Sequence, residues 1–283
     1  MNEAAFSEIL SGLYDNQVVP YLGPGVLFDV KSKLNGQAIP ADSDSLILAM
    51  NGGKPMAPKL MFEFPRAAMN QELKRGRNFL TQFLDKTYAD SQWSRAAIHD
   101  WLAEWKPAYV IDINRDTQLQ DSYADEEHIL VVGTARIIGN DFRYKLYHYD
   151  GKQYFSIKQH EADACLPILF KPMGTPLPES SYIASDADYV DYITELMGGF
   201  AIPDFLKQYR KDKKYLLLGM TLNRDSERMV MSDIVYGGDS HRGWFLRQNP
   251  SDKERRFAAK MGLELIEADC VDLINYMRLP QVA

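Results

Sequence analysis

Stretches with the pattern of buried strands alternate along most of the chain with stretches that have the apolar spacing of amphipathic helices. Apolar runs rich in β-branched or aromatic residues predict buried strands, and most of these runs end in Gly, Asn, Asp or Thr. The runs lie at 18–26, 108–113, 166–170, 215–218, 243–247 and 263–266. Helical spacing predicts helices over about 3–15, from 185 onward, over 251–261 and over 269–277. This alternation is typical of an α/β fold with a doubly wound, mostly parallel Rossmann-like sheet.

Two longer segments depart from the alternation. Residues 59–105 have helical periodicity almost throughout, which predicts a helical insertion. From 128 to 160 the pattern changes to short strand-like runs, with Asp150 and Gly151 where a hairpin turn would fall, and this predicts an inserted antiparallel β unit. The strand-like runs lie at 128–132, 135–138, 142–147 and 153–157. We expect both insertions to belong to a single domain over 1–283.

A long loop is predicted between the first strand and the helical segment. Residues 27–58 are rich in Gly, Pro, Asp and Ser around a short apolar patch at 46–50, which predicts one small helix within the loop. Such a loop is either a ligand lid or a plain surface excursion, and the pattern alone does not separate the two.

Composition narrows the class of protein. Of the 283 residues 46% are hydrophobic and 25% charged, which is typical of a globular chain. A net charge of −7 argues against a nucleic-acid partner. No apolar run approaches the roughly 18 residues that span a bilayer, so we expect a soluble, cytoplasmic protein without a membrane partner. Cys165 and Cys270 form no C-x-x-C pair, so neither a disulfide framework nor a metal is expected.

The first strand ends in two glycines, Gly23 and Gly25, on either side of Pro24. A strand that stops at glycines can bring bare backbone against a phosphate, since side chains there would block the approach. An ordinary tight connection has the same pattern, so the turn alone does not identify a site.

Four strand ends, taken in order, resemble the motifs of the sirtuin fold. The turn 22–27 resembles the family's G-A-G-[VI]-S, and 111–116 resembles its T-T-N-[YF]-D. Residues 170–174 resemble K-[LP]-H-G, and 216–225 resemble the last glycine-containing strand end. In particular, the chain is similar to the bacterial sirtuin-like domain of NAD-hydrolysing anti-phage defence proteins.

The resemblance implies that NAD is the substrate or ligand, with no metal, and that the site lies at the carboxyl ends of the strands. It implies that Asn114 and Asp116 border the nicotinamide ribose as catalytic residues, with Asn114 positioning a water molecule. The backbone N–H groups of Gly23 and Gly25 would face the pyrophosphate, and Thr221 would add a hydroxyl group. The full set of implied ligand-binding residues is Gly23, Pro24, Gly25, Val26, Asn114, Asp116, Lys171, Gly174, Gly219, Thr221, Asp225 and Asn249.

The chain departs from the family pattern at the position of the catalytic histidine, and this departure leaves several functions possible. Either Lys171 or Met173 stands at the family's catalytic histidine, and neither is a ready base at neutral pH. Either His148 or His160 reaches in from the inserted unit, or the domain binds nucleotide with little turnover. The possible functions are therefore an NAD glycohydrolase, an NAD or ADP-ribose sensor, and a protein-interaction module that uses 128–160. A homo-oligomer is compatible with each, whereas zinc-dependent deacylation is disfavoured because the four-cysteine module is absent.

Overall fold

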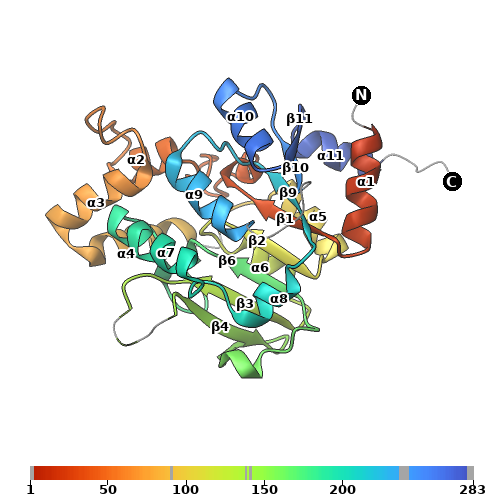
Figure 1. Ribbon diagram of the computed structural model, residues 1–283. Helices are drawn as coiled ribbons and strands as arrows, with labels where there is room; N and C mark the ends of the chain where they lie inside the picture. Colours follow the sequence, from red (N-terminus) through yellow and green to blue (C-terminus); the bar gives the residue numbers. More distant parts are fainter. Residues whose placement is uncertain (1–2, 90–91, 138, 140–141, 236–241, 279–283) are drawn as a thin grey trace.

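The computed structural model describes residues 3–89, 92–137, 139, 142–235 and 242–278. Its centre is a nine-stranded sheet in the order β11-β10-β9-β1-β2-β6-β3-β4-β5, and a separate two-stranded sheet pairs β7 with β8 (Figure 1). Helices cover both faces of the large sheet. This arrangement confirms the predicted doubly wound, mostly parallel α/β fold.

Seven neighbouring strands of the large sheet pair in parallel. Two further strands extend one edge, and each of them pairs antiparallel with the strand before it. The parallel strands are β11 (Leu263–Ile266), β10 (Gly243–Leu246), β9 (Lys214–Leu218), β1 (Val18–Leu22), β2 (Tyr109–Asp112), β6 (Ile168–Lys171) and β3 (His128–Gly133). The antiparallel ones are β4 (Tyr144–Tyr149) and β5 (Tyr154–Ser156), and the small sheet is β7 (Gly174–Thr175) with β8 (Ser181–Tyr182). The predicted strands thus lie where their apolar runs placed them.

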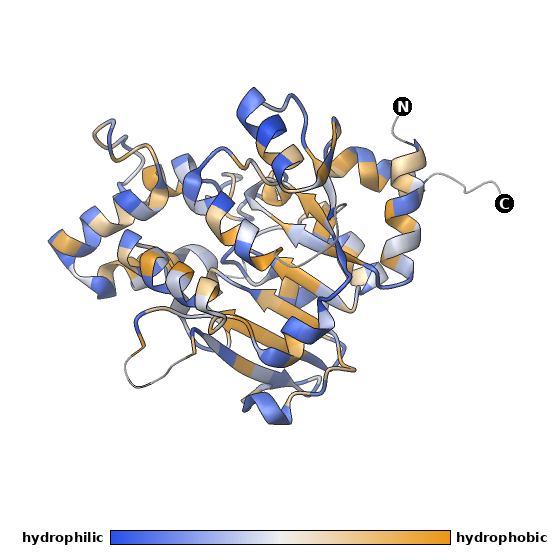
Figure 2. Ribbon diagram, in the orientation of Figure 1, coloured by the Kyte–Doolittle hydropathy of each residue, from blue (hydrophilic) through white to orange (hydrophobic). Residues whose placement is uncertain are grey.

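Successive residues of each central strand belong to different layers of the core. In β1, Leu22 packs in one hydrophobic cluster and Tyr21 in the other, as the two-residue period of a strand requires. The first cluster is covered by α1 (Glu3–Tyr14), α2 (Ser43–Met50), α3 (Phe64–Arg75), α4 (Arg77–Tyr88), α5 (Ala97–Trp105), α6 (Gln118–Ser122) and α11 (Cys270–Arg278). The second is covered by α7 (Asp186–Gly198), α8 (Asp204–Tyr209), α9 (Asp225–Ile234) and α10 (Asp252–Lys260). Apolar strands therefore lie between two helical layers (Figure 2).

Helix starts are fixed by local polar contacts. Ser185 and Asp188 form the capping box at the start of α7, and Ser251 and Glu254 form another at α10. Each box satisfies backbone N–H groups that a helix leaves without partners at its first turn. The small helix expected near 46–50 is α2, whose N-cap Asp42 accepts a hydrogen bond from the Ser45 amide.

The segment 128–160 differs from the predicted separate β unit. Its first strand, β3, is buried along its whole length and pairs in parallel with β6, so it belongs to the central sheet. Only β4 and β5 are antiparallel, with the Asp150 turn between them. Residues 135–137 form no strand, and Ile138, the last residue of that predicted run, lies outside the described residues. Burial on both faces explains why β3 reads as an apolar run without alternation.

The helical segment predicted at 59–105 is less continuous than its periodicity suggested. Residues 59–63 are not helical, and Gly76, with a φ of +84°, separates α3 from α4. Residues 92–96, which precede α5, are not helical. The short elements α6, α8 and β7 were not predicted, because two to six residues carry little periodic signal.

The topology creates a crevice next to β1. The chain leaves β1 toward β2 on one side, whereas it leaves β9 toward β10 on the other. In open α/β sheets the crevice at such a switch point, at the carboxyl ends of the strands, is where ligands bind. Within the described part of the chain, none of the helices combines the length and the apolar character needed to cross a membrane.

Candidate functional site

A cleft of about 700 Å³ opens at the carboxyl ends of β1 and β9. Its walls are the turn after β1, the segment 37–48 and the loop between β9 and α9. The volume lies within the range of about 300–1,000 Å³ that is usual for small-molecule sites. Of the residues predicted for a ligand, Pro24, Gly25 and Thr221 line this cleft.

The glycines of the β1 turn serve a close backbone contact with β9. The Gly23 N–H donates to the Leu218 carbonyl and the Gly25 N–H to the Gly219 carbonyl, both at 2.8 Å. A Cβ atom on Gly25 would lie 2.8 Å from the Gly219 oxygen, so a side chain does not fit there. The expectation that these two N–H groups face a pyrophosphate is therefore wrong, because the protein backbone already uses both.

Gly219, Gly174 and Val26 also have structural reasons for their identity. Gly219 has a φ of +65°, and a Cβ atom there would lie 2.4 Å from the Val26 amide nitrogen. Gly174 has a φ of +87° and approaches the Ser181 carbonyl within the small sheet. The Val26 side chain is completely buried in the core. None of the three lines the cleft or the cavity beside it, so their role as ligand contacts stays a prediction.

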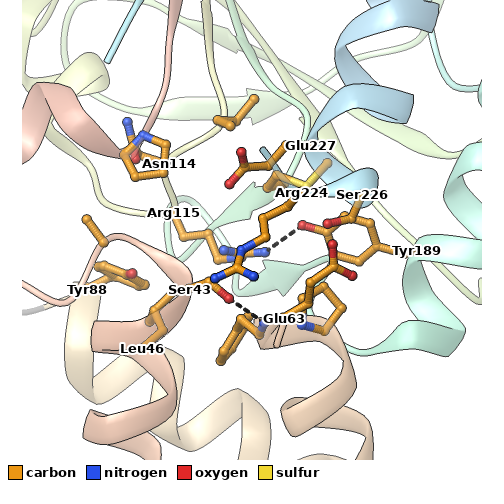
Figure 3. Close-up of a pocket in the computed structure, with 16 residues that line it drawn as sticks. Ser43, Leu46, Glu63, Tyr88, Asn114, Arg115, Tyr189, Arg224, Ser226 and Glu227 are labelled. Carbon is orange, nitrogen blue, oxygen red and sulfur yellow. Dashed lines mark hydrogen bonds between the residues drawn. The ribbon is translucent and has the colours of Figure 1, made fainter. Parts of the chain in front are cut away.

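A second cavity of about 50 Å³ adjoins the cleft and contains the side chain of Asn114 in its wall (Figure 3). The two spaces share Pro24, Ala41, Ser43, Arg224 and Glu227 as lining residues. Asn114 Nδ2 donates to the Gly23 carbonyl at 3.0 Å and to Asp112 Oδ1 at 2.8 Å. The Asn114 Oδ1 atom is buried without a hydrogen-bond partner among the described residues. This amide is thus held firmly while its acceptor oxygen remains available.

Charged residues that the sequence analysis did not single out surround Asn114. The Arg115 guanidinium donates to the Ile183 carbonyl, with 2.6 Å from Nη2, and lies over the Phe64 ring. On the opposite wall Thr221 Oγ1 donates to Glu227 Oε2 at 2.9 Å. Burial raises the pKa of Glu227, although the Thr221 hydroxyl lowers it. Arg115 lies one position from the predicted Asn114 and Glu227 two positions from the predicted Asp225, so this proximity was the only signal for them in the sequence.

Met173, rather than Lys171, occupies the wall where the resemblance places a histidine. Met173 lines the Asn114 cavity, whereas Lys171 lines neither the cavity nor the cleft. Lys171 Nζ is completely buried and lies 2.7 Å from Asp112 Oδ2. Burial raises the pKa of Asp112 to about 6, against the opposing effect of Lys171. Lys171 therefore neutralises a buried carboxylate, and its predicted contact with a ligand has no support from its position.

Asp116 faces away from Asn114, so the two predicted catalytic residues do not share a cavity. Asp116 Oδ1 accepts a hydrogen bond from the Gln118 amide at the start of α6, at 2.8 Å. Its side chain lines a separate space of about 250 Å³. His99, from α5, is its partner in a buried cluster that also contains Asp112.

The remaining predicted residues lie at the rim or beyond it. Asp225 is exposed and pairs with Arg228, and its amide donates to Glu63 Oε1 at 3.0 Å. Asn249, in the loop after β10, is also exposed. Neither lines the two cavities, and neither do His148 and His160. The expectation that one of these histidines reaches in is wrong, because β4 and the turn after β5 lie at the far edge of the sheet.

The sequence of the chain resembles a known protein family over the part that includes this site. The family model of the SIR2-like domain matches residues 108–266, which is more than half of the chain. The match runs from β2 to β11 and includes Asn114, Met173 and Thr221. A search of the curated proteins found no match.

Proposed function

The chain belongs to the SIR2-like domain family, and we propose that it binds NAD or ADP-ribose in the cleft between β1 and β9. The family generally binds NAD. The observation that carries the proposal is the 700 Å³ cleft at the switch point, which continues into the cavity where the Asn114 oxygen lacks a partner. An orphaned buried acceptor is costly unless a ligand or water satisfies it.

Two of the lining residues can contact the pyrophosphate of an anionic dinucleotide, although the carboxylates of Asp42, Asp44 and Glu227 also line the cleft. Arg224 lies in the wall of both cavities, stacks over Phe62 and has Asp44 at 3.6 Å as its ion-pair partner. Such a distance leaves the guanidinium able to form shorter hydrogen bonds with a pyrophosphate. The Thr221 hydroxyl, on the same wall, can donate to a phosphate oxygen if its hydrogen bond to Glu227 breaks. Arg224 and Thr221 are therefore the proposed pyrophosphate contacts.

We propose that binding, with little turnover, is the main activity. The cavity beside Asn114 has a volume of about 50 Å³, which is close to the volume that one or two water molecules occupy in liquid water. A nicotinamide ring can therefore enter only if the wall of the cavity moves. Met173 cannot accept a proton there. Cleavage of the nicotinamide glycosidic bond is the second candidate, and Asn114 supports it because its fixed amide could orient a water molecule.

Isothermal titration with NAD and with ADP-ribose tests binding, and chromatography for released nicotinamide tests cleavage. We expect both ligands to bind and to raise the melting temperature, without stoichiometric nicotinamide release. Arg224→Ala should weaken binding about tenfold or more, whereas Arg256→Ala, on the exposed face of α10, should leave it unchanged. If neither ligand binds wild-type protein, the proposal fails.

A second function rests on the exposed edge of the sheet. Among the described residues, strand β5 pairs with β4 alone, ends the nine-stranded sheet and carries the half-exposed Phe155. We propose that this edge, within 128–160, pairs with the same edge of a second copy of the chain, since an unpaired strand edge is a template for association. Deletion of 128–160 is unsuitable as a test because it removes β3. Sedimentation should show a dimer in wild-type protein and a monomer in Phe155→Lys; a monomeric wild type contradicts the proposal.

A further inference from the structure

A buried cluster of three potential metal ligands lies next to Asn114. His99, Asp112 and Asp116 each offer one ligand atom, and these atoms all lie within 4.8 Å of one another. His99 comes from the first turn of α5, Asp112 ends β2, and Asp116 precedes α6. All three side chains are at least 98% buried. The tertiary structure therefore brings an imidazole and two carboxylates together out of contact with solvent.

Three polar atoms of this cluster have no hydrogen-bond partner among the described residues. Neither ring nitrogen of His99 has a hydrogen bond among the described residues, and neither has Asp116 Oδ2. A neutral imidazole coordinates metals through one ring nitrogen, and neither nitrogen of His99 is taken up by a hydrogen bond within the described part of the chain. Buried polar groups are nearly always satisfied, and an exception of three atoms in one place calls for a bound species.

We propose that His99, Asp112 and Asp116 bind a divalent first-row metal ion, with Zn²⁺ as the best-fitting ion. Nitrogen and carboxylate ligands bind Zn²⁺ tetrahedrally at about 2.0–2.2 Å, so two ligand atoms on one ion lie about 3.3–3.6 Å apart. The ligand atoms of the cluster all lie within 4.8 Å of one another, so the widest separation would have to contract by about 1 Å when the ion binds. The expectation of no metal from the sequence rested on cysteine spacing, which this ligand set does not use.

Lys171 does not block the site. Asp112 Oδ1 accepts from the Asn114 N and Nδ2 atoms, and Oδ2 accepts from Lys171, which leaves one Oδ2 lone pair for an ion. Two carboxylates, one ammonium group and a neutral imidazole give the cluster a net charge of −1. An added cation is therefore attracted, and it would contact Asp116 Oδ2 and one of the two ring nitrogens of His99.

The ion would act on the site through Asn114. Asp112 holds both the backbone and the side-chain nitrogen of Asn114, so a ligand bond to Asp112 would restrict the amide that faces the proposed nucleotide site. This inference goes beyond the proposed function, because the metal can bind whether or not the cleft takes NAD.

Metal content measured on tag-free protein tests the inference. After removal of metals with EDTA and reloading with Zn²⁺, mass spectrometry of the desalted wild type should show one equivalent, and the melting temperature should rise by several degrees. His99→Leu, which replaces a side chain without hydrogen bonds, should fold and lose both effects. Asp116→Asn provides a second variant if His99→Leu does not fold, and His160→Gln, at an exposed position, is the control that should retain the ion.

Two results would overturn the inference. One is wild-type protein that holds no more Zn²⁺ than either cluster variant after desalting. The other is a melting-temperature rise of equal size in wild type and variants, which would place the ion elsewhere and leave the cluster to buried water. NAD titration of the same samples keeps the two proposals apart, since failure of metal binding leaves nucleotide binding measurable.

Discussion

Lys171 Nζ and Asp112 Oδ2 form an ion pair of 2.7 Å in which both side chains are completely buried. Asp112 in turn holds the Asn114 amide at the edge of the proposed nucleotide site. The pair thus links the strand end of β6 to the position of Asn114.

Removal of Lys171 alone should be strongly destabilising. Lys171→Met leaves the Asp112 carboxylate buried without its counter-charge, and we expect a loss of about 3–5 kcal/mol in the free energy of unfolding, measured in urea. The double variant Lys171→Met with Asp112→Asn should lose less than Lys171→Met alone, because no unpaired charge remains. Strict additivity of the two single variants would contradict this account.

Gly219→Ala should test the close approach of β9 to the β1 turn. Its φ of +65° is matched by the φ of +66° at the exposed Gly52, where an added Cβ meets nothing within 4 Å. Gly52→Ala should therefore cost only the roughly 1–2 kcal/mol of the left-handed conformation. Gly219→Ala should cost distinctly more because of the contact with Val26, and equal losses in thermal or urea denaturation would count against a steric role.

Thr221→Val should weaken nucleotide binding without removing the cleft. Loss of one hydroxyl donor of the wall should reduce NAD affinity about fivefold, or about 1 kcal/mol, in isothermal titration. Thr194→Val removes a comparable hydroxyl on the exposed side of α7, where Thr194 Oγ1 donates to the Val190 carbonyl. That control should bind NAD as wild type does, and an unchanged affinity in Thr221→Val would remove Thr221 from the proposed contacts.

Acid should destabilise the protein in part through His128. Burial lowers the pKa of His128 to about 4, so the folded state keeps the neutral ring while the unfolded chain takes up a proton below its ordinary pKa of 6.5. Stability from this residue is therefore present above pH 6.5 and is lost as the pH falls toward 4.

The measurement is the free energy of unfolding at pH 7 and pH 5. The wild type should lose about 2 kcal/mol more between these values than His128→Gln, which carries no titrating ring. His160→Gln, at an exposed position, should keep the wild-type dependence. A parallel loss in wild type and His128→Gln would show that His128 titrates normally in the folded state.

Much of the fold followed from local patterns. The apolar runs at 18–26, 108–113 and 215–218 predicted strands because side chains buried on both faces must be apolar regardless of what packs against them. The polar residues after these runs predicted one functional edge, since parallel strands end on the same side of a sheet. The family model of the SIR2-like domain confirms the family over 108–266, which includes the strand ends after β2 and β9 but not the turn after β1.

The side-chain directions could not be predicted in the same way. Asn114 and Asp116 are two residues apart, yet Asn114 lines the 50 Å³ cavity beside the cleft and Asp116 lies near His99, because Asp116 accepts a hydrogen bond from the Gln118 amide at the start of α6. Likewise, the Gly23 and Gly25 N–H groups donate to β9, whose partner carbonyls lie almost two hundred residues away in sequence.

The sequence by itself determined the strands, their polar ends and the family, because the burial of a strand and the residues of a turn depend on a few neighbouring positions. Only the tertiary structure decided that Lys171 neutralises Asp112, that Met173 lines the cavity, and that His99 joins two aspartates. These relationships arise where separate segments meet in a water-excluded interior, and there each charge and each polar atom depends on partners that no local pattern identifies.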